Sequence, residues 1–173
     1  MSDFDLDDYI NNTKDFPKKG ILFKDIGPLL LNHQAMTKVV DIFATKASEL
    51  NADLIAGIES RGFLFSTLLA SRLGIGSLMI RKPGKLPGDL IEKSYSLEYG
   101  DSKLSIQKSK NIANKKVIII DDIIATGGSL SCAELLINEA KAKVISCFVL
   151  IELLELNGSN LIDSDIFSIK KYW

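Results

Sequence analysis

The four consecutive β-branched residues from Val117 to Ile120 constrain the fold more than any other part of this chain. Such residues favour extended backbone, and a strand that is apolar on both sides must be covered on both faces. Other short apolar runs predict further buried strands, at 52–58, 75–80 and 144–151. Helical periodicity and helix-ending signals predict the intervening helices, at 34–50, 63–73 and 129–142. This alternation predicts an α/β fold in which a mostly parallel, twisted sheet is flanked by helices.

Three segments do not follow this alternation. We predict a short N-terminal helix at 3–12 and irregular backbone at 16–28, where proline and glycine recur. Residues 81–103 also carry several prolines and glycines among charged side chains. So long an irregular segment in a compact domain is typical of an active-site lid, although two strands joined at Gly88-Asp89 are an alternative. With either structure, we expect this segment to be mobile.

The composition limits the classes of function. With 46% apolar and 25% charged residues, the chain is expected to form one domain over residues 1–173. Its net charge of −1 argues against binding to nucleic acid, which needs a basic face. Residues 1–8 are acidic and no long apolar run follows, so we expect neither a secretory signal nor a membrane span. Cys132 and Cys147 predict buried thiols in a protein of the reducing cytoplasm, since two cysteines and His33 make neither a zinc site nor a disulfide framework.

The most informative segment for function follows the β-branched run. Asp121 and Asp122 end the predicted strand, and a loop of small residues then leads into the next predicted helix. Ligands of open α/β sheets bind beyond the carboxyl ends of the strands. Backbone amides of a glycine-containing loop and of a helix start are suited to a phosphate group. We therefore predict a phosphate-binding loop made of Ala125, Thr126, Gly127, Gly128 and Ser129.

The two acids and the two hydroxyl groups of this segment complete the predicted site. Thr126 and Ser129 can donate further hydrogen bonds to a phosphate. Asp121 and Asp122 are suited to accept from ribose hydroxyls and to hold a hydrated Mg²⁺, bound through substrate and water rather than directly. A Gly-Gly turn capped by Ser129 would be the simpler interpretation of the glycines alone. The acids, small residues and hydroxyls together resemble the phosphoribosyl pyrophosphate signature of the type I phosphoribosyltransferases.

Four further segments resemble one branch of that family, the adenine phosphoribosyltransferases. They are Phe16 to Ile26, Glu59-Ser60-Arg61-Gly62-Phe63, Arg81 to Gly88 and Ser94 to Gly100, within a resemblance that runs from about Phe16 to Leu153. It implies the type I fold, with a small N-terminal hood at about 1–32 and a flexible lid loop at about 81–103. It also implies a glycosyltransferase of purine salvage that joins adenine to phosphoribosyl pyrophosphate, giving AMP and pyrophosphate. Mg²⁺ as cofactor and a homodimer are implied by the resemblance alone.

The resemblance assigns the pyrophosphate to two segments. Glu59, Ser60 and Arg61 match the family loop that holds pyrophosphate through backbone amides and the arginine, and that commonly contains a non-proline cis peptide. The guanidinium of Arg61 suits this role because its planar fork matches phosphate oxygens. On the lid, the predicted pyrophosphate ligands are the three cations Arg81, Lys82 and Lys85. Closure of the lid would exclude water from an activated ribosyl group.

Glu98 and Tyr99 are the residues expected nearest to the reacting atoms. Displacement at the anomeric carbon develops positive charge on the sugar, which a carboxylate can stabilise. Adenine must also lose a proton when its N9 bonds to ribose, and Glu98 could accept or share that proton. The sequence does not separate these two roles.

The adenine site is predicted from the hood. Leu22, Phe23 and Lys24 match the family segment in which backbone groups recognise the base, with lysine in place of a frequent arginine. A backbone acceptor can take a hydrogen of the 6-amino group and would repel a 6-oxo purine. Leu153 matches an apolar position on the other side of the ring, although a role in the core would explain it nearly as well.

Three other functions are alternatives to this one. A transferase for hypoxanthine, guanine, xanthine or orotate would share the phosphate loop, but the hood and lid resemble the adenine branch. A regulator that senses phosphoribosyl pyrophosphate would usually carry a DNA-binding module and could dispense with Glu98. A phospho-accepting domain that uses Asp121 leaves the run from Thr126 to Ser129 unexplained. The C-terminal segment 157–173 matches weakly, and the sequence assigns it no function.

Overall fold

The computed structural model describes residues 4–97, 100–108 and 110–173 and divides the chain into two compact units. The first unit is Met1–Ile42 and the second is Phe43–Trp173. The boundary falls inside the long helix α2 (His33–Leu50), which matches the predicted helix at 34–50.

The N-terminal unit contains a small antiparallel sheet that the sequence did not predict. A single 3-10 turn, η1 (Leu6–Tyr9), is followed by β1 (Asn11–Lys14), which pairs with β2 (Leu22–Asp25). The short helix α1 (Gly27–Leu31) then begins with a proline in its first turn, a position that needs no amide donor. The helix predicted at 3–12 is therefore reduced to the 3-10 turn. The irregular backbone predicted at 16–28 is confirmed at 16–21 but is wrong where β2 and α1 form. Strand pairing across the intervening turn fixes these residues, and local pattern did not reveal it.

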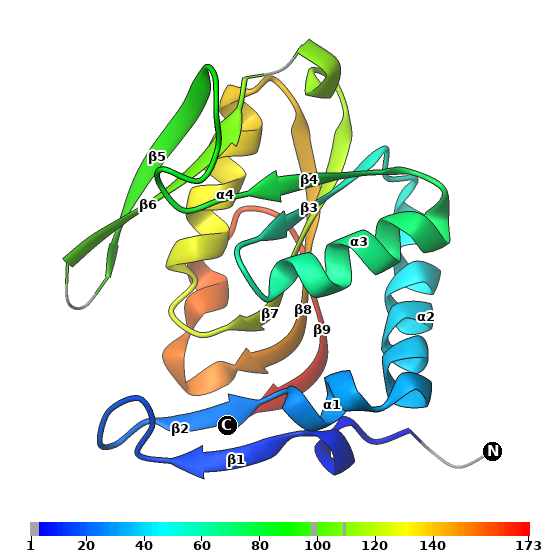
Figure 1. The fold of residues 1–173 in the computed structure, drawn as a ribbon, viewed down its shortest axis with the longest axis vertical. Helices are drawn as coiled ribbons and strands as arrows, with labels where there is room; N and C mark the ends of the chain where they lie inside the picture. Colours follow the sequence, from blue (N-terminus) through cyan, green and yellow to red (C-terminus); the bar gives the residue numbers. More distant parts are fainter. Residues whose placement is uncertain (1–3, 98–99, 109) are drawn as a thin grey trace. The chain divides into compact units, whose positions relative to one another are not determined.

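The second unit is built on a five-stranded sheet in which all neighbouring strands are parallel (Figure 1). The strand order is β4-β3-β7-β8-β9. The strands are β3 (Leu54–Ile58), β4 (Gly76–Ile80), β7 (Lys116–Ile124), β8 (Lys143–Leu153) and β9 (Ile166–Tyr172). The helices α3 (Gly62–Leu73) and α4 (Gly128–Glu139) connect them, and α3 ends at the left-handed Gly74 as predicted. The predicted α/β fold with a parallel sheet flanked by helices is confirmed.

Both faces of β7 are covered, as its β-branched run predicted. Val117 and Ile119 belong to a core cluster with residues of α4 such as Leu136. On the other face, Phe43 of α2 stacks on Phe148 of β8, with ring centroids 5.6 Å apart. Rings from α3 and β9 also pack against Phe43. Because the central strand is enclosed, polar groups can reach solvent only near its ends.

The strand β4 differs from the expectation of a buried strand at 75–80. It is the edge strand of the sheet, and three of its residues, Gly76, Ser77 and Met79, are exposed. An apolar run does not distinguish an edge strand from a central one, because coverage depends on which strands come to lie beside it.

The segment predicted as a lid or as a pair of strands is largely a hairpin. β5 (Leu90–Leu97) pairs antiparallel with β6 (Gly100–Gln107), and the pair packs against α4 (Figure 1). The register runs from Leu90 opposite Gln107 to Leu97 opposite Gly100, so the strands are joined after Leu97. The predicted joint at Gly88-Asp89 is therefore wrong: Gly88 has a positive φ of 80° but precedes both strands.

Both cysteines are free and buried, as predicted. Burial raises the pKa of the Cys147 thiol to about 12. Among the described residues, no helix combines the length and the apolar character that crossing a membrane would need.

Candidate active site

The predicted phosphate-binding loop lies at the carboxyl end of the central strand. β7 continues through Asp121 and Asp122 to Ile124, four residues further than the predicted strand at 117–120. The predicted strand ends before the acids because the β-branched run ends at Ile120 and aspartate is uncommon in strands. Gly127 has a left-handed φ of 82°, which favours glycine, and α4 begins at the next residue. The loop amides and the first turn of α4 thus adjoin the two acids.

A pocket of about 310 Å³ brings most of the predicted site residues of the second unit together. It includes both acids, the whole phosphate loop and residues from the end of β3 and from the lid. The predicted site residues that line it are Glu59, Ser60, Arg61, Lys82, Asp121, Asp122, Ala125, Thr126, Gly127, Gly128 and Ser129. The other predicted residues of this unit that the structure describes, Arg81, Lys85 and Leu153, do not line it.

Close packing of α3 against β7 places Arg61 beside the acids. A Cβ added to Gly62 would lie 2.6 Å from the carbonyl oxygen of Ile120, so only glycine allows this approach. At the preceding residue, Nε of Arg61 lies 3.0 Å from Oδ2 of Asp122, whose side chain is only 3% exposed. The peptide bond between Glu59 and Ser60 is cis, as the resemblance implied. The ion pair of Arg61 with Asp122 thus links the predicted pyrophosphate loop to the acid pair.

The acid pair is held in an environment that disfavours its charges. Desolvation by the surrounding protein, followed by the charge of Asp122, raises the pKa of Asp121 well above its ordinary value. Desolvation also raises the pKa of Asp122, although the charge of Arg61 opposes this. The amide of Asp122 donates to Oδ1 of Asp121 at 2.9 Å, which fixes the side chain. Such a pair is suited to bind cations and hydroxyl donors, because these compensate the buried charge.

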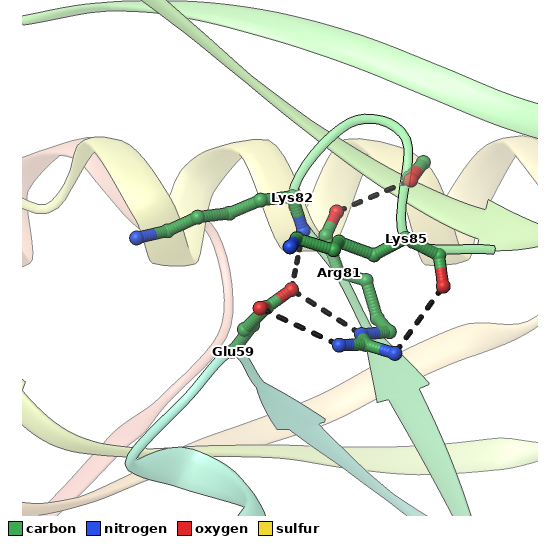
Figure 2. Close-up of polar contacts among 5 residues, drawn as sticks. Glu59, Arg81, Lys82 and Lys85 are labelled. Carbon is green, nitrogen blue, oxygen red and sulfur yellow. Dashed lines mark hydrogen bonds and ion pairs between the residues drawn. The ribbon is translucent and has the colours of Figure 1, made fainter.

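Glu59 holds the base of the lid, as Figure 2 shows. Its carboxylate accepts hydrogen bonds from Nε of Arg81 at 3.3 Å and from the amide of Lys82 at 2.9 Å. Nη1 of Arg81 donates to the carbonyl oxygen of Lys85 at 3.2 Å. Although desolvation acts in the opposite direction, these hydrogen bonds and the charges of Arg81 and Lys85 lower the pKa of Glu59. Arg81 is thus bound to Glu59 beside the pocket rather than extended into it.

Tyr95 is a pocket residue that the sequence reasoning did not single out. It lies on β5 and lines the pocket, and the hydroxyl of Ser129 donates to its phenol oxygen at 3.1 Å. The hydrogen bond joins the hairpin to the phosphate loop. The polar aromatic residues of the segment from Ser94 to Gly100 were the available signal, but only the register of β5 shows which of them faces α4.

The remaining predicted residues are not tested by this pocket. Glu98 and Tyr99 lie outside the described residues. Leu22, Phe23 and Lys24 lie on β2 of the first unit, where the ring of Phe23 packs edge-on against Phe16 at 5.1 Å. Leu22 is 45% exposed, whereas Lys24 is buried. Their assignment to adenine stays a prediction.

The side chains of the pocket suit a metal ion that binds mainly to the substrate and to water, rather than one coordinated by the protein alone. Within the described ranges, no three histidine, cysteine or acidic side chains are grouped to bind a metal directly. Mg²⁺ typically keeps several waters and uses one or two carboxylates together with substrate phosphates. Asp121 and Asp122, next to a phosphate-binding loop, provide that arrangement.

Comparison with known proteins gives one consistent family. The phosphoribosyl transferase domain family matches residues 29–170. The chain is 45% identical to an adenine phosphoribosyltransferase of Mycoplasmopsis fermentans, over 97% of this chain and 99% of that protein. It is 40% identical to one of Synechococcus, over 96% and 95%. The adenine phosphoribosyltransferase of Saccharomyces cerevisiae, solved with adenine and an imino-altritol bisphosphate, superposes with a TM-score of 0.92 at 38% identity, over 95% and 96% of the two chains.

The raised pKa of Asp121 predicts that this residue lowers the stability of the protein at neutral pH. Because the folded state binds the proton more tightly, stability falls as pH rises from about 4, the ordinary pKa of aspartate, through the raised value. Asp121→Asn removes this loss. We expect urea denaturation to show a higher midpoint than wild type at neutral pH, with the difference shrinking below about pH 4. Glu155 is exposed, so Glu155→Gln serves as the control and should shift the urea midpoint little at either pH. A shift of the midpoint in Asp121→Asn that does not depend on pH would contradict the prediction.

Proposed function

The chain belongs to the adenine phosphoribosyltransferase family and transfers the 5-phosphoribosyl group from phosphoribosyl pyrophosphate to adenine in purine salvage, and we propose how its residues do so. The products are AMP and pyrophosphate. The observation that carries the proposed roles is the pocket in which the loop 125–129, the acid pair and Arg61 meet. Each group of that pocket suits a different part of phosphoribosyl pyrophosphate.

The 5′-phosphate is assigned to the loop from Ala125 to Ser129. Support comes from the left-handed Gly127 and from the start of α4, where unpaired backbone amides and the helix dipole favour an anion. Thr126 adds a hydroxyl donor, and the hydroxyl of Ser129 would add another once it turns from the phenol oxygen of Tyr95 to the phosphate. The pocket wall therefore offers neutral hydrogen-bond donors at this end.

The ribose hydroxyls are assigned to Asp121 and Asp122. Both carboxylates are desolvated, so hydroxyl donors and a hydrated cation would stabilise their charged forms. Mg²⁺ bound to the pyrophosphate would supply charge neutralisation of the leaving group. The ion pair of Arg61 with Asp122 keeps the guanidinium next to the expected pyrophosphate position, and the planar fork of this group matches phosphate oxygens.

The three cations of the lid differ in their position relative to the pocket. Lys82 lines the pocket and is assigned to the pyrophosphate. Arg81 and Lys85 would reach it only when the lid closes. Glu59 carries a negative charge and would repel pyrophosphate, so its side chain is assigned to holding Arg81, while the backbone at 59–61 binds the anion. Of the pyrophosphate-binding role that the family resemblance gave to Glu59, only the part of its backbone remains in this proposal.

The reacting atoms and the base are assigned by the family resemblance. Glu98 and Tyr99 are proposed to lie beside the anomeric carbon, where Glu98 either stabilises developing positive charge or accepts the proton of adenine. Leu22, Phe23, Lys24 and Leu153 are proposed to hold adenine, the backbone of the hood reading the 6-amino group. The hood at about 1–32 and the lid at about 81–103 would then be parts of one catalytic domain.

We also propose a cytoplasmic homodimer. The support is the family and an exposed apolar group on neighbouring elements of the second unit: Leu64 and Leu68 on α3, and Met79 on β4. Such side chains are commonly covered in oligomers. Sedimentation at micromolar concentration is expected to give twice the monomer mass of 19.0 kDa, and a monomer would contradict the proposal.

The reaction itself is tested with single purines. In the presence of phosphoribosyl pyrophosphate and Mg²⁺, we expect labelled adenine to yield AMP. Hypoxanthine and guanine should react at least about 100-fold less efficiently, because a backbone acceptor facing a 6-oxo group is left unpaired. Removal of Mg²⁺ with EDTA should abolish turnover, and excess Mg²⁺ should restore it. Equal use of hypoxanthine would overturn the assignment of the base.

The role of Glu98 is tested by Glu98→Ala. We expect kcat to fall by about 100-fold or more while the KM for phosphoribosyl pyrophosphate changes little, because the lost interaction belongs to the transition state. Glu92→Ala, an exposed carboxylate on the same hairpin, is the matched control and should retain turnover. Turnover of Glu98→Ala close to wild type would remove Glu98 from the chemistry.

A further inference from the structure

The phosphate-binding loop packs backbone against backbone on a residue close to the C-terminus, Gly158. A Cβ added to Gly158 would overlap the carbonyl oxygen of Ala125 and would lie 2.6 Å from the amide nitrogen of Gly127. In the reverse direction, a Cβ on Gly127 would overlap the carbonyl oxygen of Gly158 and would lie 2.9 Å from its carbonyl carbon. Contacts this short leave no room for any side chain on either residue. The loop is therefore supported from behind by the segment η4 (Gly158–Leu161).

A second anchor holds the same C-terminal segment to α4. Glu134 lies on α4 and is only 4% exposed. Its carboxylate accepts hydrogen bonds from the amides of Asp163 and Ser164, each at 3.0 Å, and from the hydroxyl of Ser164. The helix α4 thus has the phosphate loop at its start. About one and two-thirds turns later it carries a buried acid, Glu134, that binds the turn before β9.

This arrangement makes the position of the loop amides depend on Gly158. The neighbours that an added methyl group would meet are backbone atoms of residues 125–127, which cannot rotate away as a side chain can. The backbone of Gly158 is not among the positive-φ glycines, so alanine is accessible to its conformation and the effect of the substitution is steric alone. Relief of the overlap requires the loop or the segment behind it to move.

We propose that Gly158 is a positioning residue for the 5′-phosphate site, with the segment 157–164 acting as the fixed support against which the loop amides are aligned. The inference rests on the proposed role of the loop. It gives a role to a segment whose residues do not line the pocket. Preorganised donors bind an anion without the cost of ordering the loop, so a displaced loop should bind the phosphate group more weakly.

The test is the affinity of Gly158→Ala for ribose 5-phosphate, a probe that carries the 5′-phosphate but no pyrophosphate. Isothermal titration is expected to show binding weakened by about tenfold or more. Affinity for pyrophosphate, which is assigned to the loop at 59–61 and to the lid, should stay near wild type. In steady-state kinetics the KM for phosphoribosyl pyrophosphate should rise while the KM for adenine stays unchanged, a split that a general loss of stability would not give.

The matched control is Gly76→Ala on β4 of the same unit. There an added Cβ would meet only Cδ1 of Leu54, at 3.1 Å, which is the end of a flexible side chain. This variant should bind ribose 5-phosphate like wild type. Should Gly158→Ala fail to fold, Glu134→Gln tests the other anchor, because an amide cannot accept at both positions and the turn at 163–164 is loosened without any overlap at the loop. A severalfold weaker affinity for ribose 5-phosphate is expected for that variant.

The results separate the inference from the proposed function. If folded Gly158→Ala binds ribose 5-phosphate with wild-type affinity, the inference is overturned and the role of the loop stands. If Gly158→Ala does not fold, wild-type affinity in Glu134→Gln has the same meaning. If the wild-type protein itself does not bind ribose 5-phosphate, the role of the loop is overturned and the inference falls with it.

Discussion

The enclosure of β7 between two helical layers is the constraint on which the rest of this structure depends. Its first half, Val117 to Ile120, is fully buried and apolar, and its second half carries Asp121 and Asp122 toward the rim of the sheet. Burial of apolar side chains on both faces stabilises the strand, whereas desolvation of the acids opposes folding. In the function proposed here, this polar end of β7 is the part that holds the sugar and the cation, and both would offset the cost of desolvating the acids.

The charges around the pocket are paired in ways that keep each of them in place. Arg61 faces Asp122 and Arg81 faces Glu59, so each arginine is held by an acid from a different segment. A buried ion pair contributes little net stability, since desolvation offsets the attraction. Its contribution here is positional: Asp122 orients the arginine of the pyrophosphate loop, and Glu59 orients the first residue of the lid. Loss of either acid would remove the ion pair that helps to orient the arginine.

Close backbone contacts at glycine residues also hold segments of the pocket in position, at places where no ion pair does so. Gly62 brings the start of α3 against β7, and Gly127 and Gly158 bring the phosphate loop against the C-terminal segment. A loop of small residues is flexible on its own, because glycine has wide conformational freedom. Contacts on its far side restrict that freedom, and the buried Glu134 holds the supporting segment to α4. The pocket is thus held in position by a contact near the start of the second unit, at Gly62, and by another near its end, at Gly158.

The sequence by itself determined the α/β class, the central strand, the helices α2, α3 and α4, and the glycine-containing loop between β7 and α4, because each of these depends on the pattern of neighbouring residues. It also identified the family, through motifs that lie in loops. Only the tertiary structure decided that β4 is an edge strand, that β1 and β2 pair, and that the hairpin is joined after Leu97 rather than at Gly88-Asp89. It alone showed that Glu59 binds Arg81 and that Gly158 lies in close backbone contact with the loop. These features depend on contacts between residues distant in the chain, and local periodicity carries no information about which distant segment will lie alongside.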